Sequence, residues 1–308
     1  MIWPFDIGGV VLALYVITFA LHAVFVSYVL AGTAYVLVRR DDRATSIVRD
    51  RLPFMLGCGI TAGVAPLLFT QLLYQRRFYT ANLLLGPRWL AVVPALVVGF
   101  YALYLAKSRP RWRTRALVAA LACFAFVAWS WTELHELGMA DAAWRDFYAG
   151  GHRLFVDGDI APRLIVWFGA MATLFATVAA WSADARRLAI VAIAGRIVSA
   201  AGAGWLAARG FTADGPAAAW LVVLGSAVAA ELVGWLLVLR DRPIGLPIAT
   251  AGCTAALLAA CIVREAPRLA MIVPAPEASG GVVFAVTLVV ATAAIAWVVR
   301  TVRSADPE

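Results

Sequence analysis

His22 is the residue of this chain best suited to carry chemistry. It is one of three histidines and the only one inside a long apolar run, residues 9–38. A coordinating side chain is expensive to place in hydrocarbon, so its presence there indicates a function. Because a neutral imidazole binds haem iron, His22 is our candidate metal ligand, for a b-type haem. The same pattern also fits a buried histidine that is hydrogen-bonded to a neighbouring helix.

Four more polar residues are expected at a similar depth. At about 1.5 Å per residue, counting from the inner end of each apolar run places His22 about 25 Å in and Gln71 about 28 Å in. Glu133 and His135 come out at about 27–30 Å. Arg163 begins a later run at the outer face, where an arginine can pair with haem propionates. We therefore predict a cofactor-binding belt in the outer half of the membrane, for haem b or a quinone, formed by His22, Gln71, Glu133, His135 and Arg163.

Arg196 and Glu231 form a second candidate feature. Each lies nine residues from the inner end of its apolar run, so two antiparallel neighbours would hold both at about 14 Å depth. A lone charge at that depth would cost several kcal/mol. We predict a structural ion pair between them, and a proton path is the alternative.

The elements that position these residues are membrane-spanning helices. Of 308 residues, 63% are hydrophobic and 14% are charged, whereas soluble domains are nearer half and a quarter. The net charge of +8 is spread over short connectors rather than one face, which argues against nucleic acid as a partner. A span needs about 20 apolar residues. We predict one all-α, polytopic domain over residues 1–308, with about nine spans near 9–38, 53–74, 89–106, 116–133, 161–182, 187–208, 217–239, 243–263 and 279–299.

The connectors predict the orientation of the bundle. Sixteen basic residues lie on one alternate set of connectors and eight on the other. The richer set belongs in the cytoplasm, which places the N-terminus outside and the C-terminus inside. The longest outer connector, 134–160, is long enough for an interfacial helix or a lid. A run of small residues at 199–204 predicts close packing of the sixth span.

Three stretches resemble the cytochrome bd quinol oxidase family, specifically its larger haem-bearing subunit I. They are "FALHAVFVSYVLAG", "GVAPLLFTQLLY" and "WSWTELHELGM", and the resemblance covers roughly residues 9–185. His22 falls on the position of an early histidine that ligates a haem in that family. The resemblance implies a bacterial cytoplasmic (inner) membrane location and a role in the respiratory chain.

The departures from that family are as informative as the matches. Gln71 stands where the family has an acidic ligand, and the fifth span offers Ile165, Val166 and Trp167 where the family has an axial histidine. Residues 209–216 form a short connector where the family has its long quinol loop. We therefore do not expect a self-sufficient, oxygen-reducing oxidase.

The favoured hypothesis is a bd-like, non-autonomous subunit of an oxidoreductase complex. It would hold haem b or a quinone in the outer half and pass electrons to other membrane or periplasmic subunits, such as a c-type cytochrome. A second haem ligand is left open between His135, Met171 and water. The alternative is a cofactor-free scaffold or anchor subunit. A proton or solute transporter that uses Arg196 and Glu231 is the least favoured hypothesis.

Overall fold

The apolar runs form helices because a backbone inside hydrocarbon must satisfy its own hydrogen bonds. The computed structural model describes residues 7–39, 43–151, 153–211 and 216–271, together with 289, 290, 292, 293 and 297, and these residues contain no strand. Eight of the described helices are long and apolar enough to cross a membrane. The chain is therefore an all-α, integral membrane protein. The ninth predicted span, 279–299, lies almost wholly outside the described residues.

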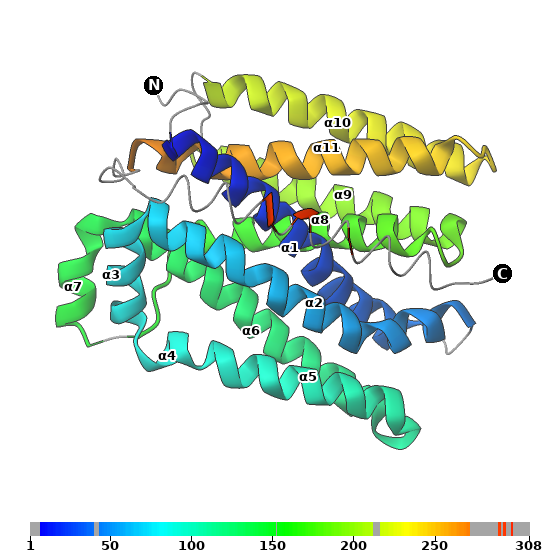
Figure 1. Ribbon diagram of the computed structural model, residues 1–308, viewed down its shortest axis with the longest axis horizontal. Helices are drawn as coiled ribbons and strands as arrows, with labels where there is room; N and C mark the ends of the chain where they lie inside the picture. The colour runs from blue at the N-terminus through cyan, green and yellow to red at the C-terminus, as the bar shows by residue number, and fades with distance from the viewer. Residues whose placement is uncertain are drawn as a thin grey trace.

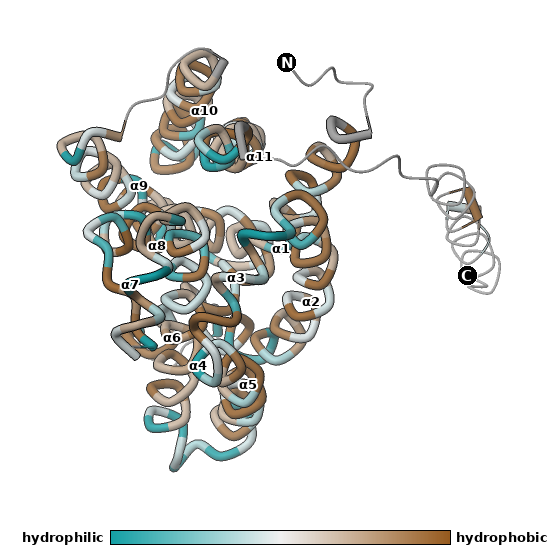
Figure 2. The backbone as a smooth tube through the Cα atoms, turned by 90° about the vertical axis from the view of Figure 1, so that its left-hand side faces the viewer, coloured by the Kyte–Doolittle hydropathy of each residue, from teal (hydrophilic) through white to brown (hydrophobic). Residues whose placement is uncertain are grey.

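The long helices come in four antiparallel hairpins that follow one another along the chain (Figure 1). They are α1 (Ile7–Val38) with α2 (Arg43–Leu73), α5 (Val92–Ser108) with α6 (Arg113–Met139), α8 (Ile160–Ala179) with α9 (Ala185–Ala208), and α10 (Pro216–Leu239) with α11 (Gly245–Glu265). Helix α1 is central, because it contacts α2, α6, α8 and α11. Figure 2, which looks along the helices, shows the α10–α11 hairpin as a separate layer beside the others.

The short helices gather at one end of the bundle (Figure 1). We call this the outer end, following the orientation predicted from the charge bias. It carries α3 (Gln75–Leu85), α4 (Pro87–Leu90), α7 (Trp144–Ala149) and the 3-10 turns η2 (Asp141–Ala143) and η3 (Ala266–Met271). Helix α7 lies in the long outer connector, and Trp144 Nε1 donates to the Leu137 carbonyl of α6 at 2.6 Å. The opposite, inner end has the 3-10 turn η1 (Pro110–Trp112) and short turns.

Helix α2 begins ten residues before the span predicted at 53–74. The residues ahead of that span are charged but still helical, so most of the predicted inner connector 39–52 is the first part of α2. Arg51 there donates to Ser182 Oγ at 2.6 Å, and Lys107 donates to the Asp50 carbonyl at 3.2 Å. Charged side chains at a helix end reach the membrane surface, which lets the helix extend beyond the hydrocarbon.

Glycines set the spacing inside two of the hairpins. A Cβ added at Gly169 would lie 2.4 Å from Ser199 N, and one at Gly234 would lie 2.3 Å from Ala249 N. Within the small-residue run at 199–204, Gly202 makes such a contact with Val166 N, whereas Gly204 has nothing within 4 Å. The run therefore packs closely through Gly202, on the face that meets α8, as expected where small residues let helices approach in lipid.

Candidate functional site

A buried carboxylate joins four elements at the outer end. Glu265, at the end of α11, is 1% exposed. Its Oε1 accepts from Tyr15 of α1 at 3.1 Å, and its Oε2 accepts from Tyr74 at 2.8 Å and from Arg268 Nη1 at 3.3 Å. Arg264 Nη1 also donates to Glu265 and to the Tyr15 hydroxyl. Because each of these donors satisfies a buried charge, the carboxylate fixes α1, the junction of α2 and α3, α11 and η3 together.

His135 extends this network to α6. Its Nδ1 lies 3.1 Å from Arg264 Nη2. A guanidinium only donates, so Nδ1 is the acceptor and the neutral imidazole carries its hydrogen on Nε2. His135 is 5% exposed, and Nε2 has no hydrogen-bond partner. The nearest carboxylate oxygen to it is Glu136 Oε1, at 3.7 Å.

Glu136 in turn reaches α8. Its Oε1 lies 2.6 Å from Arg163 Nε, and the Arg163 guanidinium stands over the Phe211 ring at 5.7 Å. We call the whole assembly the outer polar cluster. With His135 neutral it holds three guanidinium groups and two carboxylates, and Asp157, within 4.8 Å of Glu136, offsets the remaining positive charge. Its members are Tyr15, Tyr74, His135, Glu136, Arg163, Arg264, Glu265 and Arg268.

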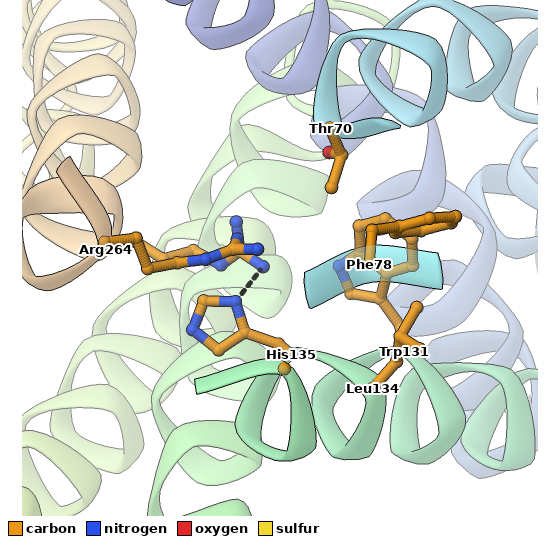
Figure 3. Close-up of a pocket in the computed structure, with 8 residues that line it drawn as sticks. Thr70, Phe78, Trp131, Leu134, His135 and Arg264 are labelled. Carbon is orange, nitrogen blue, oxygen red and sulfur yellow. Dashed lines mark hydrogen bonds between the residues drawn. The ribbon is translucent and has the colours of Figure 1, made fainter. Parts of the chain in front are cut away.

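A small cavity adjoins the cluster (Figure 3). Its volume is about 10 Å³, which is the room for about one water molecule. Figure 3 shows His135 and Arg264 on one side of it, with Phe78, Trp131 and Leu134 facing them and Thr70 above. In this arrangement of side chains the cavity has no room for a quinone ring.

Tyr74 follows the last residue of the second membrane span and is 1% exposed. Burial, together with the charge of Glu265, raises the pKa of the Tyr74 hydroxyl well above its usual value. The phenol therefore stays protonated and acts as a donor to Glu265. Arg268 stacks over its ring at 3.9 Å, which adds a cation–π contact to the same side chain.

Glu133 belongs to a different network. It is fully buried, and its Oε1 accepts the backbone N–H of Phe155 at 2.6 Å while Oε2 pairs with Arg88. Arg88 also donates to the Arg153 carbonyl at 3.3 Å. These bonds hold the outer connector against α4, so Glu133 fixes the loop rather than facing the outer polar cluster.

Gln71 lies apart from both networks. The hydroxyl of Tyr79, on the exposed side of α3, donates to Gln71 Oε1 at 3.4 Å. Tyr79 is 47% exposed, which places this contact at the surface of the bundle.

His22 is half-buried between α1 and α2. Its Nδ1 lies 2.9 Å from the carbonyl of Gly59, so Nδ1–H donates and Nε2 keeps its lone pair. A Cβ added at Gly63 would come within 2.9 Å of the His22 ring. The absent side chain at Gly63 therefore makes the space that the imidazole fills.

The five residues of the predicted belt thus share the outer half of the bundle but do not form one site. The structure brings together only His135 and Arg163, which meet through Glu136. Depth along a helix does not fix the side of the helix on which a residue lies. His22 faces α2, Gln71 faces the surface and Glu133 faces the outer connector.

The main components of the outer polar cluster were missed in the sequence. Arg264 and Arg268 were counted only as connector charges, and Glu136 only as part of the outer connector. A signal was present, since Arg264 and Glu265 stand side by side at the end of an apolar span, where two charges need partners. Their main partners, Tyr15 and Tyr74, are ordinary residues at span ends and carry no such signal.

The predicted ion pair between Arg196 and Glu231 is present. Arg196 Nε and Nη2 lie 2.9 and 2.6 Å from Glu231 Oε2, and Trp235 Nε1 donates to Oε1 at 3.3 Å. Glu231 is fully buried, so the contact ties α9 to α10 within the membrane. Both carboxylate oxygens have donors, as a structural bridge requires.

Three acidic residues, Glu136, Asp157 and Asp159, also come within 4.8 Å of one another. Two of the three already have guanidinium partners, Glu136 with Arg163 and Asp159 with Arg209. The hydrogen bond that Arg209 donates to Asp159 raises the pKa of Arg209. Two guanidinium groups therefore balance two of the three carboxylates, and the charge of Asp157 is what remains for a cation.

Comparison of the chain with protein-family models, with curated proteins and with solved structures finds no match. The resemblance to the cytochrome bd family therefore rests on the three stretches named above.

Proposed function

We propose that this chain is a bd-like subunit of a respiratory electron-transfer complex in the bacterial inner membrane, and that it binds a b-type haem through His22. The observation that carries the proposal is the orientation of the His22 ring. Histidines that ligate metals usually donate their second ring N–H to a carbonyl or carboxylate, which fixes the ring and its tautomer. His22 donates Nδ1–H to the Gly59 carbonyl and leaves Nε2 as the ligating atom.

The other hydrogen-bond donors at the outer end fit a bound haem in part, as partners for its propionates. Arg163, the predicted partner of a propionate, is already paired with Glu136. Arg264 and Arg268 share the single carboxylate of Glu265, so there are two guanidinium groups for one carboxylate at this point of the outer polar cluster. They are therefore the better partners for propionates. A haem bound at His22 would supply reversible one-electron transfer.

The residues of the chain have separate tasks in this proposal. Gly59 orients His22, Gly63 gives its ring room, and the apolar faces of α1 and α2 keep water away. A haem held in the outer half would pass its electron to a partner at the outer face, such as a c-type cytochrome. The chain would act as one component of an oxidoreductase complex and not as an oxidase on its own.

A redox difference spectrum of the purified protein tests the proposal. The wild-type chain should show the reduced-minus-oxidised bands of a b-type haem, and His22→Ala should lose them. Added imidazole should restore part of the signal to His22→Ala, because it can replace the missing ligand without repairing any helix contact. Gln71→Leu is the matched control, since the Gln71 side chain is hydrogen-bonded to Tyr79 at the surface, and it should keep the full signal.

A second candidate function is a cofactor-free scaffold or anchor subunit. It is favoured by the internal pairing of the deep charges, because Glu265, Glu136 and Glu231 all have arginine partners within the chain. A scaffold would co-purify with partner subunits and show no haem bands, and His22→Ala would leave that assembly intact.

A further inference from the structure

The inner end of the bundle holds a pocket larger than the cavity beside the outer polar cluster. Its volume is about 190 Å³, and it lies among the inner ends of α1, α2 and α6. Four polar residues line it, namely Arg39, Thr45, Arg113 and Thr114. Its apolar lining comes from Val36, Leu37 and Leu117. The pocket is separate from His22 and from the outer polar cluster, which lie toward the other end of the same helices.

The polar residues of this pocket are those that recognise phosphate. A guanidinium donates paired hydrogen bonds to phosphate oxygens, and hydroxyl groups add further donors. Arg39 is exposed just beyond α1, with its guanidinium 5.7 Å from the centre of the Tyr35 ring. Two arginines and two threonines therefore surround a space large enough for a phosphate group.

The apolar residues and the position of the pocket select a lipid over a free ion. Val36 and Leu117 are buried and give the pocket an apolar wall. The spans end at Val38 and begin at Thr45 and Pro110, so the pocket lies at the depth of the lipid headgroups. Basic pockets between transmembrane helices at the cytoplasmic surface are suited to anionic headgroups.

We propose that this pocket binds one anionic phospholipid of the inner leaflet. Arg39 and Arg113 contact its phosphate, Thr45 and Thr114 lie beside them, and the aliphatic side chains contact the start of its acyl chains. A bound lipid would bridge α1, α2 and α6 at the inner end of the bundle, where α1 ends and α2 and α6 begin.

Lipid binding to the detergent-solubilised full-length chain tests this proposal. We expect phosphatidylglycerol to bind the wild-type chain and raise its melting temperature, and phosphatidylcholine to do neither. The double variant Arg39→Gln/Arg113→Gln should bind phosphatidylglycerol roughly 30-fold more weakly, as expected for two arginines near an anionic headgroup. The control Arg240→Gln/Arg242→Gln removes the same charge from exposed arginines at the same end and should bind like wild type.

Several results would overturn the proposal. Equal losses of phosphatidylglycerol affinity in the two double variants would indicate general attraction between charges instead of a specific binding site. Inorganic phosphate that displaces the lipid at matched concentration would indicate a free-anion site. Equal binding of phosphatidylcholine would remove the role of the anionic headgroup. If the double variant does not fold, the single variant Arg39→Gln of the exposed residue serves, and an unchanged affinity there also rejects the site.

Discussion

The two ends of the bundle use arginine in different ways. At the inner end the pair Arg186–Asp241 spans 3.4 Å with side chains 64% and 75% exposed. At the outer end Arg264, Arg268 and Glu265 are 9%, 7% and 1% exposed and share one network. Exposed charges at a membrane surface set topology through their number, whereas buried charges must each be matched by a partner. The buried arginines of the outer polar cluster therefore stabilise one specific arrangement of side chains. Most arginines at the inner end instead contribute to the charge bias that sets the orientation of the chain in the membrane.

The largest expected effect is the removal of the central outer carboxylate. Glu265→Leu leaves two buried guanidinium groups without their partner, which should destabilise the chain by about 3–5 kcal/mol. Its melting temperature in detergent should fall sharply compared with wild type. A loss below about 1 kcal/mol, the range of an exposed pair, would mean that the outer polar cluster is solvated like the inner end.

The second-largest effect concerns the space between α1 and α2 that the His22 ring fills. Gly63→Val inserts a side chain where the imidazole lies, and such overpacking costs about 1–3 kcal/mol and displaces the ring. If His22 ligates a haem, this variant should also lose most of its haem absorbance. Gly57→Val is the control on the same helix, six residues closer to the inner end, because nothing lies within 4 Å of its added Cβ. Equal losses of stability and haem absorbance in both variants would contradict a specific position for the His22 ring.

The third effect concerns one hydrogen bond of the outer polar cluster. Tyr74→Phe removes a donor to a buried carboxylate and should cost about 1.5–3 kcal/mol. The raised pKa of Tyr74 also gives the pH dependence a definite sign. The folded chain keeps the phenol protonated while the unfolded chain ionises near pH 10, so stability is full below about pH 10 and falls above it. Melting curves at rising pH should therefore fall less steeply for Tyr74→Phe than for wild type.

The smallest effect belongs to the inner end. Asp241→Asn removes an exposed ion pair, and Asn tolerates the positive φ of 58° at this position. The change in stability should stay below about 1 kcal/mol and should shrink further in high salt. A loss as large as that of Glu265→Leu would erase the contrast between the two ends.

The sequence was sufficient for the eight spans that the structure describes and for one buried contact. Apolar runs predict helices because lipid leaves the backbone no other partner. Depth counting also located the Arg196–Glu231 pair, since α9 and α10 are antiparallel neighbours in the chain. The same counting did not predict which outer residues meet, because His22, Gln71 and Glu133 lie on helices that face different neighbours.

The outer polar cluster was beyond sequence reasoning for a related reason. The hydrogen bond from Tyr15 to Glu265 joins residues 250 positions apart, and it exists only because α11 packs against the central helix α1. Span-end tyrosines and arginines are common at membrane surfaces, so their types alone do not reveal burial. Only the packing of the hairpins turns them into one network.

The haem content of the purified wild-type chain is the most direct test of the account. Cells that make haem in excess should yield protein with about one b-type haem per chain, and the His22→Ala variant should fall close to zero while its yield and melting temperature stay near wild type. Wild-type protein that is folded and free of haem under these conditions would contradict the role proposed for His22.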